Sequence, residues 1–515
     1  MTYRKTWFDY VLWVLYAGLC VTLLAGAGNR IYALWVGEEL AGLGAFLPFP
    51  ILLGLYPAIR QSGQAIRKRH RFSGHFCAIT ESLAVSVSFV FGTIVRLREG
   101  RITASLYGLE MGAPYTPGDY YDLAVVRAGG AGMSFVHSIS DLYVKCLRVV
   151  FSFLGNSVEA AILFQIFLQL SAMLFAYLAV RKTAGRFAAC TVLLALSFSF
   201  SFISRIDTFD PNCLLTALFL AGLYLVLSFV KASLADRNSY GSLPGAFLLG
   251  AVLGFLCYLE AGCGILFLFL AGLFTGKQTA GEGRRRQIGR LFIVIAGGAA
   301  GFFGAVAEDA SASGVVFYQG LTWWVDTFFS PDMESMRLLD VIRYQEYPLF
   351  LALFLAAAFV VFSFIRGGRE QDVSLWFLPC ILVTPVFLAD FTVAGFGGVA
   401  LFFWCVMAGL GLKNAAFGGQ AELVMERIEG INASAPVAPE PAGEMTASSG
   451  IAAPETEAAE EAEPSAKKTR FIENPLPLPK KHVKREMDYG YAVPEADMHY
   501  DVEIAEGDDF DHADE

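Results

Sequence analysis

The chain is poor in charge and in histidine. Only 17% of its 515 residues are Asp, Glu, Lys or Arg, six are histidines, and 55% are hydrophobic. The mean hydropathy is +0.52. This composition excludes a soluble enzyme, which needs more polar surface to cover its apolar side chains, and no nucleic-acid partner is expected. Much of the chain consists of long apolar runs. A helix of about 20 apolar residues crosses the roughly 30 Å of hydrocarbon in a bilayer.

The nine cysteines lack the spacing of metal or redox sites. Most sit in or beside apolar runs, where they are expected to act as small buried hydrophobes. The first apolar run, from Trp7 to Gly26, has no cleavage site and is soon followed by others, so it is expected to be an uncleaved signal anchor.

Long apolar runs stop near Leu412. From Asn414 to Glu515 the chain has 23 acidic and 8 basic residues, a net charge of −15 against −10 for the whole chain. We therefore expect a disordered acidic tail over 414–515. Within it, residues 467–485 are basic and rich in proline, which suits either a cytoplasmic protein partner or anionic membrane lipids.

The apolar runs predict an all-α membrane protein of about 12 transmembrane helices. A break near Glu260–Ala261–Gly262 divides the long run 244–275 into two short spans. The expected spans are 8–28, 38–56, 76–96, 157–180, 187–204, 210–231, 244–258, 261–275, 289–308, 347–365, 374–390 and 394–412.

Basic residues fix the expected orientation, because Lys and Arg collect in cytoplasmic loops. With twelve spans, all of the basic loops fall on one side and both termini are cytoplasmic, as in a multi-pass protein of the cell (plasma) membrane. The basic segments are 60–71, 181–186, 284–290 and 366–369.

Two sizeable outer loops follow from this topology, at about 97–156 and 309–346. Both are rich in acids and aromatics. Trp323 and Trp324 suit a membrane interface, and the rest of the second loop suits a sugar-binding rim. Glu81 and Glu260 lie beside apolar runs. An acid in such a position either lies in a polar loop or is buried in the membrane, where burial is costly and often serves a function.

An amphipathic helix is predicted before the fourth span. Its apolar positions recur at three- and four-residue steps, and a polar stripe lies opposite. Such a helix lies in the interface plane, as a plain linker or as a platform for the preceding loop at headgroup level. The apolar stripe is Ile139, Leu142, Cys146, Val149, Val150 and Phe153, and the polar stripe is Asp141, Lys145, Arg148 and Ser152.

The order of these segments resembles the C-type (GT-C fold) integral-membrane glycosyltransferases, in particular the dolichyl-phosphate-mannose protein mannosyltransferase-like branch. The resemblance covers about residues 80–310. Its elements are the acidic first outer loop, the helix ending Phe153–Leu154–Gly155, the basic turn 181–186, the span ending Ser204–Arg205, the segment 210–215 and the run 245–254.

The resemblance implies an enzyme that takes a sugar from a polyprenyl-phosphate carrier, with an Asp base in the first outer loop. The similar stretch here is Gly118–Asp119–Tyr120–Tyr121–Asp122–Leu123–Ala124. Asp119 matches best and Asp122 is the second candidate. The family's usual Glu after the Asp is replaced by Tyr120. Unperturbed aspartates are ionised at neutral pH and can accept a proton.

The resemblance also implies residues that bind the substrate. Arg205 matches a family arginine that stabilises the carrier phosphate, and Arg127 and Arg148 are further choices. Tyr121 belongs to the base motif.

Two further substrate-binding positions are less exact matches. His137 stands where the family often has His-Pro-Pro-Leu-Tyr, but this chain lacks the prolines and is longer by two residues. The family's later acidic residue falls on Asp210 in one alignment and on Asn212 in another.

The expected domains are two N-terminal spans with a basic cytoplasmic loop at 1–75, a GT-C-like transferase domain at 76–413, and the tail at 414–515. The function expected is a glycosyltransferase that serves an extracytoplasmic acceptor. No cofactor or metal site is required, although the acidic outer loops allow a divalent ion. The alternatives are a multi-pass transporter or flippase of lipid-linked material, against which stands the lack of an internal repeat, and a non-catalytic glycolipid-binding protein.

Overall fold

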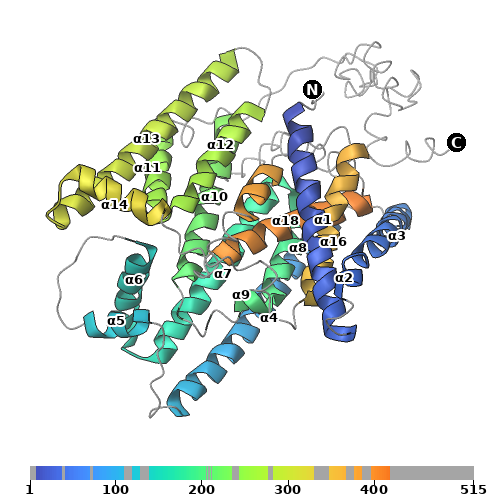
Figure 1. Ribbon diagram of the computed structural model, residues 1–515, viewed down its shortest axis with the longest axis horizontal. Coiled ribbons are helices and arrows are strands. Elements are labelled where there is room, and N and C mark those ends of the chain that lie inside the picture. Colours follow the sequence, from blue (N-terminus) through green and yellow to red (C-terminus); the bar gives the residue numbers. More distant parts are fainter. Residues whose placement is uncertain are drawn as a thin grey trace, which may run out of the picture. The chain divides into compact units, whose positions relative to one another are not determined.

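The computed structural model shows an all-α, multi-pass membrane protein (Figure 1). It describes residues 7–36, 41–69, 74–109, 119–127, 138–203, 206, 209, 211–234, 243–276, 282–329, 347–366, 376–384 and 396–417. Every regular element in these ranges is a helix. Of two compact units, Met1–Pro436 and Val437–Glu515, only the first contains described residues. The predicted tail lies almost wholly outside the described residues.

The helices follow one another along the chain with short connections. Those before the amphipathic segment are α1 (Trp7–Val36), α2 (Ala41–Gly44), α3 (Pro48–Arg69), α4 (Gly74–Leu109) and α5 (Asp119–Arg127). The next are α6 (Ile139–Leu154), α7 (Val158–Thr183), α8 (Gly185–Phe198), α9 (Phe200–Ile203), α10 (Asn212–Leu234) and α11 (Leu243–Leu259). The last are the 3₁₀ turn η3 (Ala261–Gly264), α12 (Ile265–Gly276), α13 (Glu282–Ala312), α14 (Phe317–Phe329), α16 (Tyr347–Arg366) and α18 (Phe396–Phe417).

Within the described residues, helix covers at least part of each of the twelve predicted spans. Among the residues that the structure describes, seven helices are long and apolar enough to cross a membrane, and four shorter apolar ones lie at 185–198, 243–259, 261–273 and 348–362. Of the eleventh predicted span, 374–390, only residues 376–384 are described, and they are helix. The predicted break is confirmed, because α11 ends at Leu259 and Glu260 has extended backbone before η3. A count of exactly twelve crossings stays a prediction.

One boundary of the first outer loop was predicted wrongly. The third span was expected to end at residue 96, but α4 continues to Leu109. Arginine usually ends an apolar run, whereas Arg96 is fully buried and its guanidinium is bonded within the bundle, so the helix continues past it. Beyond α4, a helix begins at Asp119, within the motif at 118–124.

Two of the predicted basic segments, 181–186 and 284–290, bond to the same end of α10, which we call the basic end of the bundle. Arg181 and Arg186 pair with Glu81 at 2.5 and 3.2 Å, which joins the start of α4 to the turn between α7 and α8. Arg290 donates to the Ser233 carbonyl at 2.9 Å, and Lys413 donates to the Ala184 carbonyl at 3.2 Å. Lys413 thus brings α18 to this turn, and Arg290 joins the first part of α13 to the end of α10. Which side of the membrane this end faces stays a prediction.

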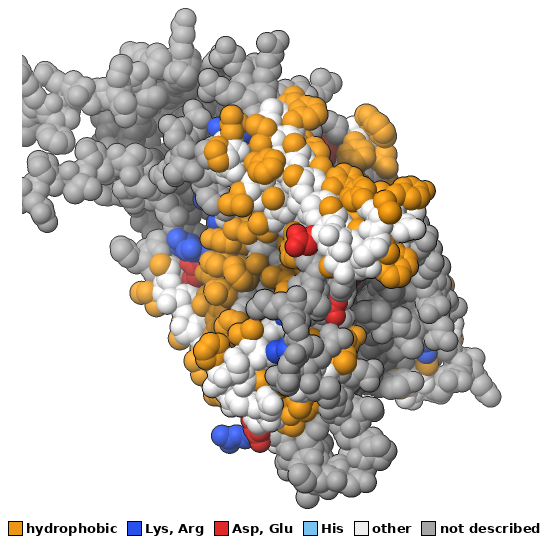
Figure 2. All heavy atoms as spheres, turned by 90° about the vertical axis from the view of Figure 1, so that its left-hand side faces the viewer, with side chains coloured by type: hydrophobic (Ala, Val, Ile, Leu, Met, Phe, Trp, Pro, Cys, Tyr) orange, Lys and Arg blue, Asp and Glu red, His pale blue; other side chains and the backbone are white. Residues whose placement is uncertain are grey.

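Helices α11 and α13 pack backbone to backbone. A Cβ added at Gly254 would meet the backbone of Gly298, and one at Gly250 would meet the carbonyl of Val294. Small residues permit this approach in membranes, where close packing and not hydrophobicity holds helices together. The outer surfaces of these helices are apolar, with Phe247, Leu248, Phe292, Ile295 and Phe303 exposed. Figure 2 shows hydrophobic side chains gathered on this side of the molecule, as a lipid-facing surface requires.

Replacing Gly254 with valine should destabilise the bundle, because the added carbons would press on the backbone of α13. Overpacking of this kind costs about 1–3 kcal/mol. The matched control is Gly304→Val in α13, where an added Cβ would meet nothing within 4 Å. Thermal unfolding in detergent should show a lowered midpoint for Gly254→Val alone. Equal midpoints would contradict the close approach of the two helices.

The predicted orientation can be tested with single added cysteines. Val316→Cys, at an exposed residue between α13 and α14, should be labelled by a membrane-impermeant maleimide in intact cells. Gln64→Cys, exposed near the end of α3, should be labelled only after permeabilisation. Labelling is read as the gain over the unsubstituted chain. The reverse pattern would invert the assigned sides.

Candidate functional site

The predicted base motif forms a short helix that lies on the amphipathic helix. The ring of Tyr121 in α5 packs edge-on against Phe151 of α6, with centroids 5.6 Å apart. Tyr120 packs against Tyr143 at 6.4 Å and accepts a hydrogen bond from Ser140 at 3.4 Å. The two tyrosines thus fasten the backbone that carries Asp119 and Asp122 to α6.

The connection between α9 and α10 reaches the same place. Phe209 is fully buried there, and its ring lies 5.5 Å from that of Tyr121. Its φ of 45° is unusual for a residue with a Cβ. Strained backbone persists only where surrounding packing holds it, and such residues cluster at functional sites. Three segments that the sequence predicted to cooperate therefore meet around Tyr121.

The structure describes these predicted site residues to different extents. Tyr121 and Arg148 are half-buried, on α5 and α6. Asp119, Asp122 and Arg127 lie within α5, but their side chains are outside the described part of the chain. His137, Arg205 and Asp210 lie outside the described residues altogether. Asn212, the alternative to Asp210, is buried at the start of α10.

Helix α6 ends where the sequence predicted, and both of its ends are capped. Ser138 accepts a hydrogen bond from the Asp141 amide, and Gly155 ends the helix with a φ of 86°. Its buried face differs from the predicted stripe. Ile139, Tyr143, Val144, Leu147 and Phe151 are buried, whereas Val149 and Phe153 are 57% and 82% exposed.

The apolar arc of α6 is wider than the sequence reading recognised. One side of the arc packs into the protein, where Tyr143 accepts a hydrogen bond from Gln165 of α7 at 3.1 Å. The other side, with Val149 and Phe153, stays exposed. A helix that is anchored on one apolar side and exposed on the other suits a position in the membrane interface.

The second predicted outer loop adjoins α6 through Tyr258, near the end of α11. Tyr258 donates to the Asp309 carboxylate at 2.8 Å, and the Trp324 indole donates to the Tyr258 carbonyl at 3.0 Å. Leu142 of α6 packs against the same cluster. The sequence gave no signal for Tyr258, which reads as one more aromatic in an apolar run. It also treated the two tryptophans alike, whereas Trp323 is 66% exposed.

The two acids beside apolar runs have different surroundings. Glu81 is buried at the basic end, where it accepts from the Tyr177 hydroxyl at 2.5 Å besides pairing with two arginines. Glu81 therefore joins α4 to α7 and α8. Glu260 is half-buried at the break between α11 and η3.

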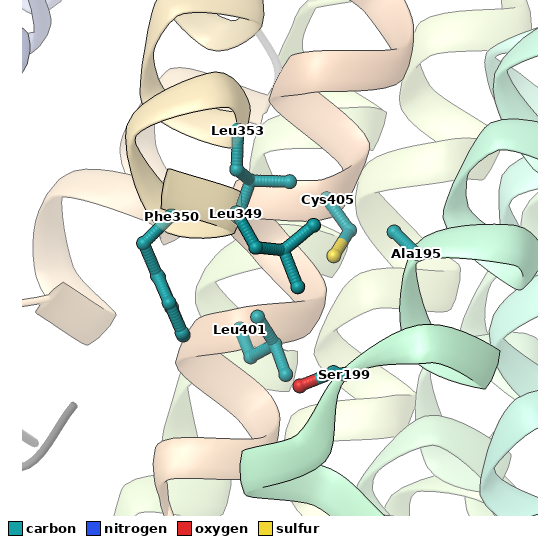
Figure 3. A pocket seen from close by; sticks show the side chains of 7 residues that line it. All are labelled: Ala195, Ser199, Leu349, Phe350, Leu353, Leu401 and Cys405. Carbon is teal, nitrogen blue, oxygen red and sulfur yellow. The ribbon is translucent and has the colours of Figure 1, made fainter. Parts of the chain in front are cut away.

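One small apolar pocket lies between α8, α16 and α18 (Figure 3). Its cavity volume is about 20 Å³, which is too small for a sugar or a phosphate. The residues that line it are Ala195, Ser199, Leu349, Phe350, Leu353, Leu401 and Cys405. Among the described residues, no group of three His, Cys, Asp or Glu side chains could hold a metal ion.

No family model and no curated protein matches the chain. One solved structure with some similarity is the archaeal oligosaccharyltransferase AglB from Archaeoglobus fulgidus, in complex with an inhibitory peptide and a dolichol-phosphate. The TM-score is 0.44 and the sequence identity 13%, over 68% of this chain and 51% of that one. This chain thus spans about half the length of that structure. A likeness of this size assigns neither family nor function.

The half-buried thiol of Cys146 reports on the packing of α6. Burial raises the pKa of this thiol above its usual value, so less thiolate is present at neutral pH. We expect slow alkylation at pH 7 that accelerates as the pH rises above the ordinary range of thiols. An added thiol at Val149→Cys, exposed on the same helix, should react faster at pH 7. Equal rates, measured by mass spectrometry, would show that α6 is not packed in this way.

Proposed function

We propose that the protein is an integral-membrane glycosyltransferase that moves a sugar from a polyprenyl-phosphate carrier to an acceptor outside the cytoplasm. The observation that supports this most is the meeting of α5, α6 and the α9–α10 connection around Tyr121. These segments carry the residues on which the resemblance to C-type glycosyltransferases depends. The transfer of a sugar needs a base, a cation and a lipid-facing surface, and each has candidates here.

Asp119 or Asp122 would act as the general base. The carboxylate takes the proton of the acceptor hydroxyl while its oxygen attacks the anomeric carbon. The bond from that carbon to the carrier phosphate breaks, the phosphate leaves with the electron pair, and the configuration at carbon inverts. Helix α5 lies on α6, so the base would be held at the membrane interface, where the lipid phosphate arrives.

Cations would stabilise the charge that develops on the leaving phosphate. Arg205 is the first candidate, and Arg127 and Arg148 are further ones. Arg148 stands with Lys145 on the polar face of α6, and both are half-buried. A basic stripe beside exposed apolar residues suits an anionic lipid head. Tyr121, His137 and Asp210 would contact the substrate.

The direct experiment is sugar transfer by membranes that contain the protein, from a radiolabelled panel of polyprenyl-phosphate sugars. Asp119→Asn and Asp122→Asn are compared with the wild type. Because general-base catalysis contributes about 10²–10⁴-fold, the base variant should lose most of its activity. Glu159→Gln removes an exposed carboxylate at the start of α7 and should leave transfer unchanged.

Expression and thermal stability of each variant are measured alongside, so that loss of transfer is not confused with loss of fold. Transfer that is indifferent to both aspartate substitutions would remove the base assignment. No transfer from any donor would favour a binding or transport role.

A further inference from the structure

Arg96 is fully buried inside the membrane-spanning part of α4. Its Nε donates to the Gln169 side-chain oxygen of α7 at 2.8 Å, and its Nη1 donates to the Gly92 carbonyl at 3.0 Å. Its Nη2 donates to the Leu196 carbonyl of α8 at 3.3 Å. The guanidinium thus ties three helices together within the bundle. A charge at such a depth is costly, so its surroundings indicate a purpose.

The partners of Arg96 surround a break in a helix. Helix α8 ends at Phe198, Ser199 has extended backbone, and α9 begins at Phe200. Leu196, before the break, is bonded by Arg96, and the Phe202 carbonyl, after it, accepts from Gln169 at 2.7 Å. A break in a membrane helix leaves backbone groups that water cannot satisfy. Arg96 and Gln169 supply donors on both sides of it.

The chain beyond this break leads to the candidate site. Ile206 is fully buried and lies close to Gly100 of α4. Three residues later Phe209, in its strained conformation, packs on Tyr121 of α5. The direction in which the chain leaves α8 therefore affects where Phe209 meets the helix that carries Asp119 and Asp122.

We propose that Arg96 and Gln169 are positioning residues, which fix the break between α8 and α9. Through Phe209, which packs on Tyr121, they would hold α5 near the start of α10. Neither side chain needs to touch substrate. The structural part of this proposal stands by itself, while its effect on sugar transfer rests on the proposed function.

The structural part is tested without any substrate. Tyr121→Cys and Phe209→Cys are introduced together in the full chain, joined by a short bismaleimide, and the linked peptides are quantified by mass spectrometry. Arg96→Met is then added. The matched control is Arg98→Met, because Arg98 is exposed on the same helix two residues away. We expect cross-linking to fall at least fivefold with Arg96→Met and to be unchanged with Arg98→Met.

A second cysteine pair distinguishes a local shift from general unfolding. Phe175→Cys and Tyr224→Cys join α7 to α10, where the two rings lie 6.1 Å apart. This cross-link should persist in the Arg96→Met protein. If Arg96→Met fails to fold, Gln169→Leu, which keeps the size of the side chain and removes its polar atoms, replaces it in the same test. Unchanged Tyr121–Phe209 cross-linking in a folded Arg96 or Gln169 variant would overturn the proposal.

If transfer activity is found, its kinetics test the catalytic part. Misplacement of a catalytic group by about 1 Å can cost about a hundredfold in rate. We expect Gln169→Leu to lower kcat by about that factor with little change in KM. Loss of cross-linking with unchanged kcat would refute the catalytic consequence alone. An absence of transfer in the wild type would refute the proposed function and leave the cross-linking result intact.

Discussion

Backbone groups inside hydrocarbon must find partners within the protein, and this requirement determines where the structure can depart from regular helix. The chain breaks helices within its apolar segments at Ser199 and at Glu260. At the first break, side chains from α4 and α7 donate hydrogen bonds to the backbone carbonyls of Leu196 and Phe202. At the second, Trp324 donates to the Tyr258 carbonyl. Both breaks lie close to the end of the bundle that carries α5 and α6.

The two ends of the bundle are therefore built differently. The basic end is held by charge, with Glu81 between two arginines and Lys413 on a helix end. The other end is held mainly by aromatic rings and by hydrogen bonds of tyrosines, among them those of Tyr121, Tyr143 and Tyr258. Rings offer rigid contact area without a fixed charge. Under the proposed function, such an end would leave Arg127, Arg148 and Arg205 available for the carrier phosphate.

The apolar runs predicted the helices well, since a long hydrophobic segment has few other ways to satisfy its backbone. The prediction of a helix end failed at a residue that can either end an apolar run or be buried within it. Arg96 reads as the end of a span, and only its partners on α7 and α8 reveal that the helix continues. The sequence analysis did not predict the helix α5, which packs against α6.

The candidate site was predictable in its segments and less so in its contacts. The resemblance gave the motif at 118–124, and the spacing of apolar residues gave the amphipathic helix. It could not give the pairing of Tyr121 with Phe209, nor the cluster around Tyr258, because neither follows from sequence spacing. The roles of Asp119, Asp122 and Arg205 remain predictions.

The glycine contacts between α11 and α13 restrict how this protein can move. Where two backbones touch at Gly250 and Gly254, no side-chain rotamers are available to let one helix slide past the other. Helices α11 and α13 should therefore move as one rigid body. Any movement that opens the protein to a bulky lipid would then occur at hinge residues where these two helices end. These are Glu260 and η3 at the end of α11, and Ser313–Gly314 at the end of α13, where the positive φ of Gly314 marks a sharp turn.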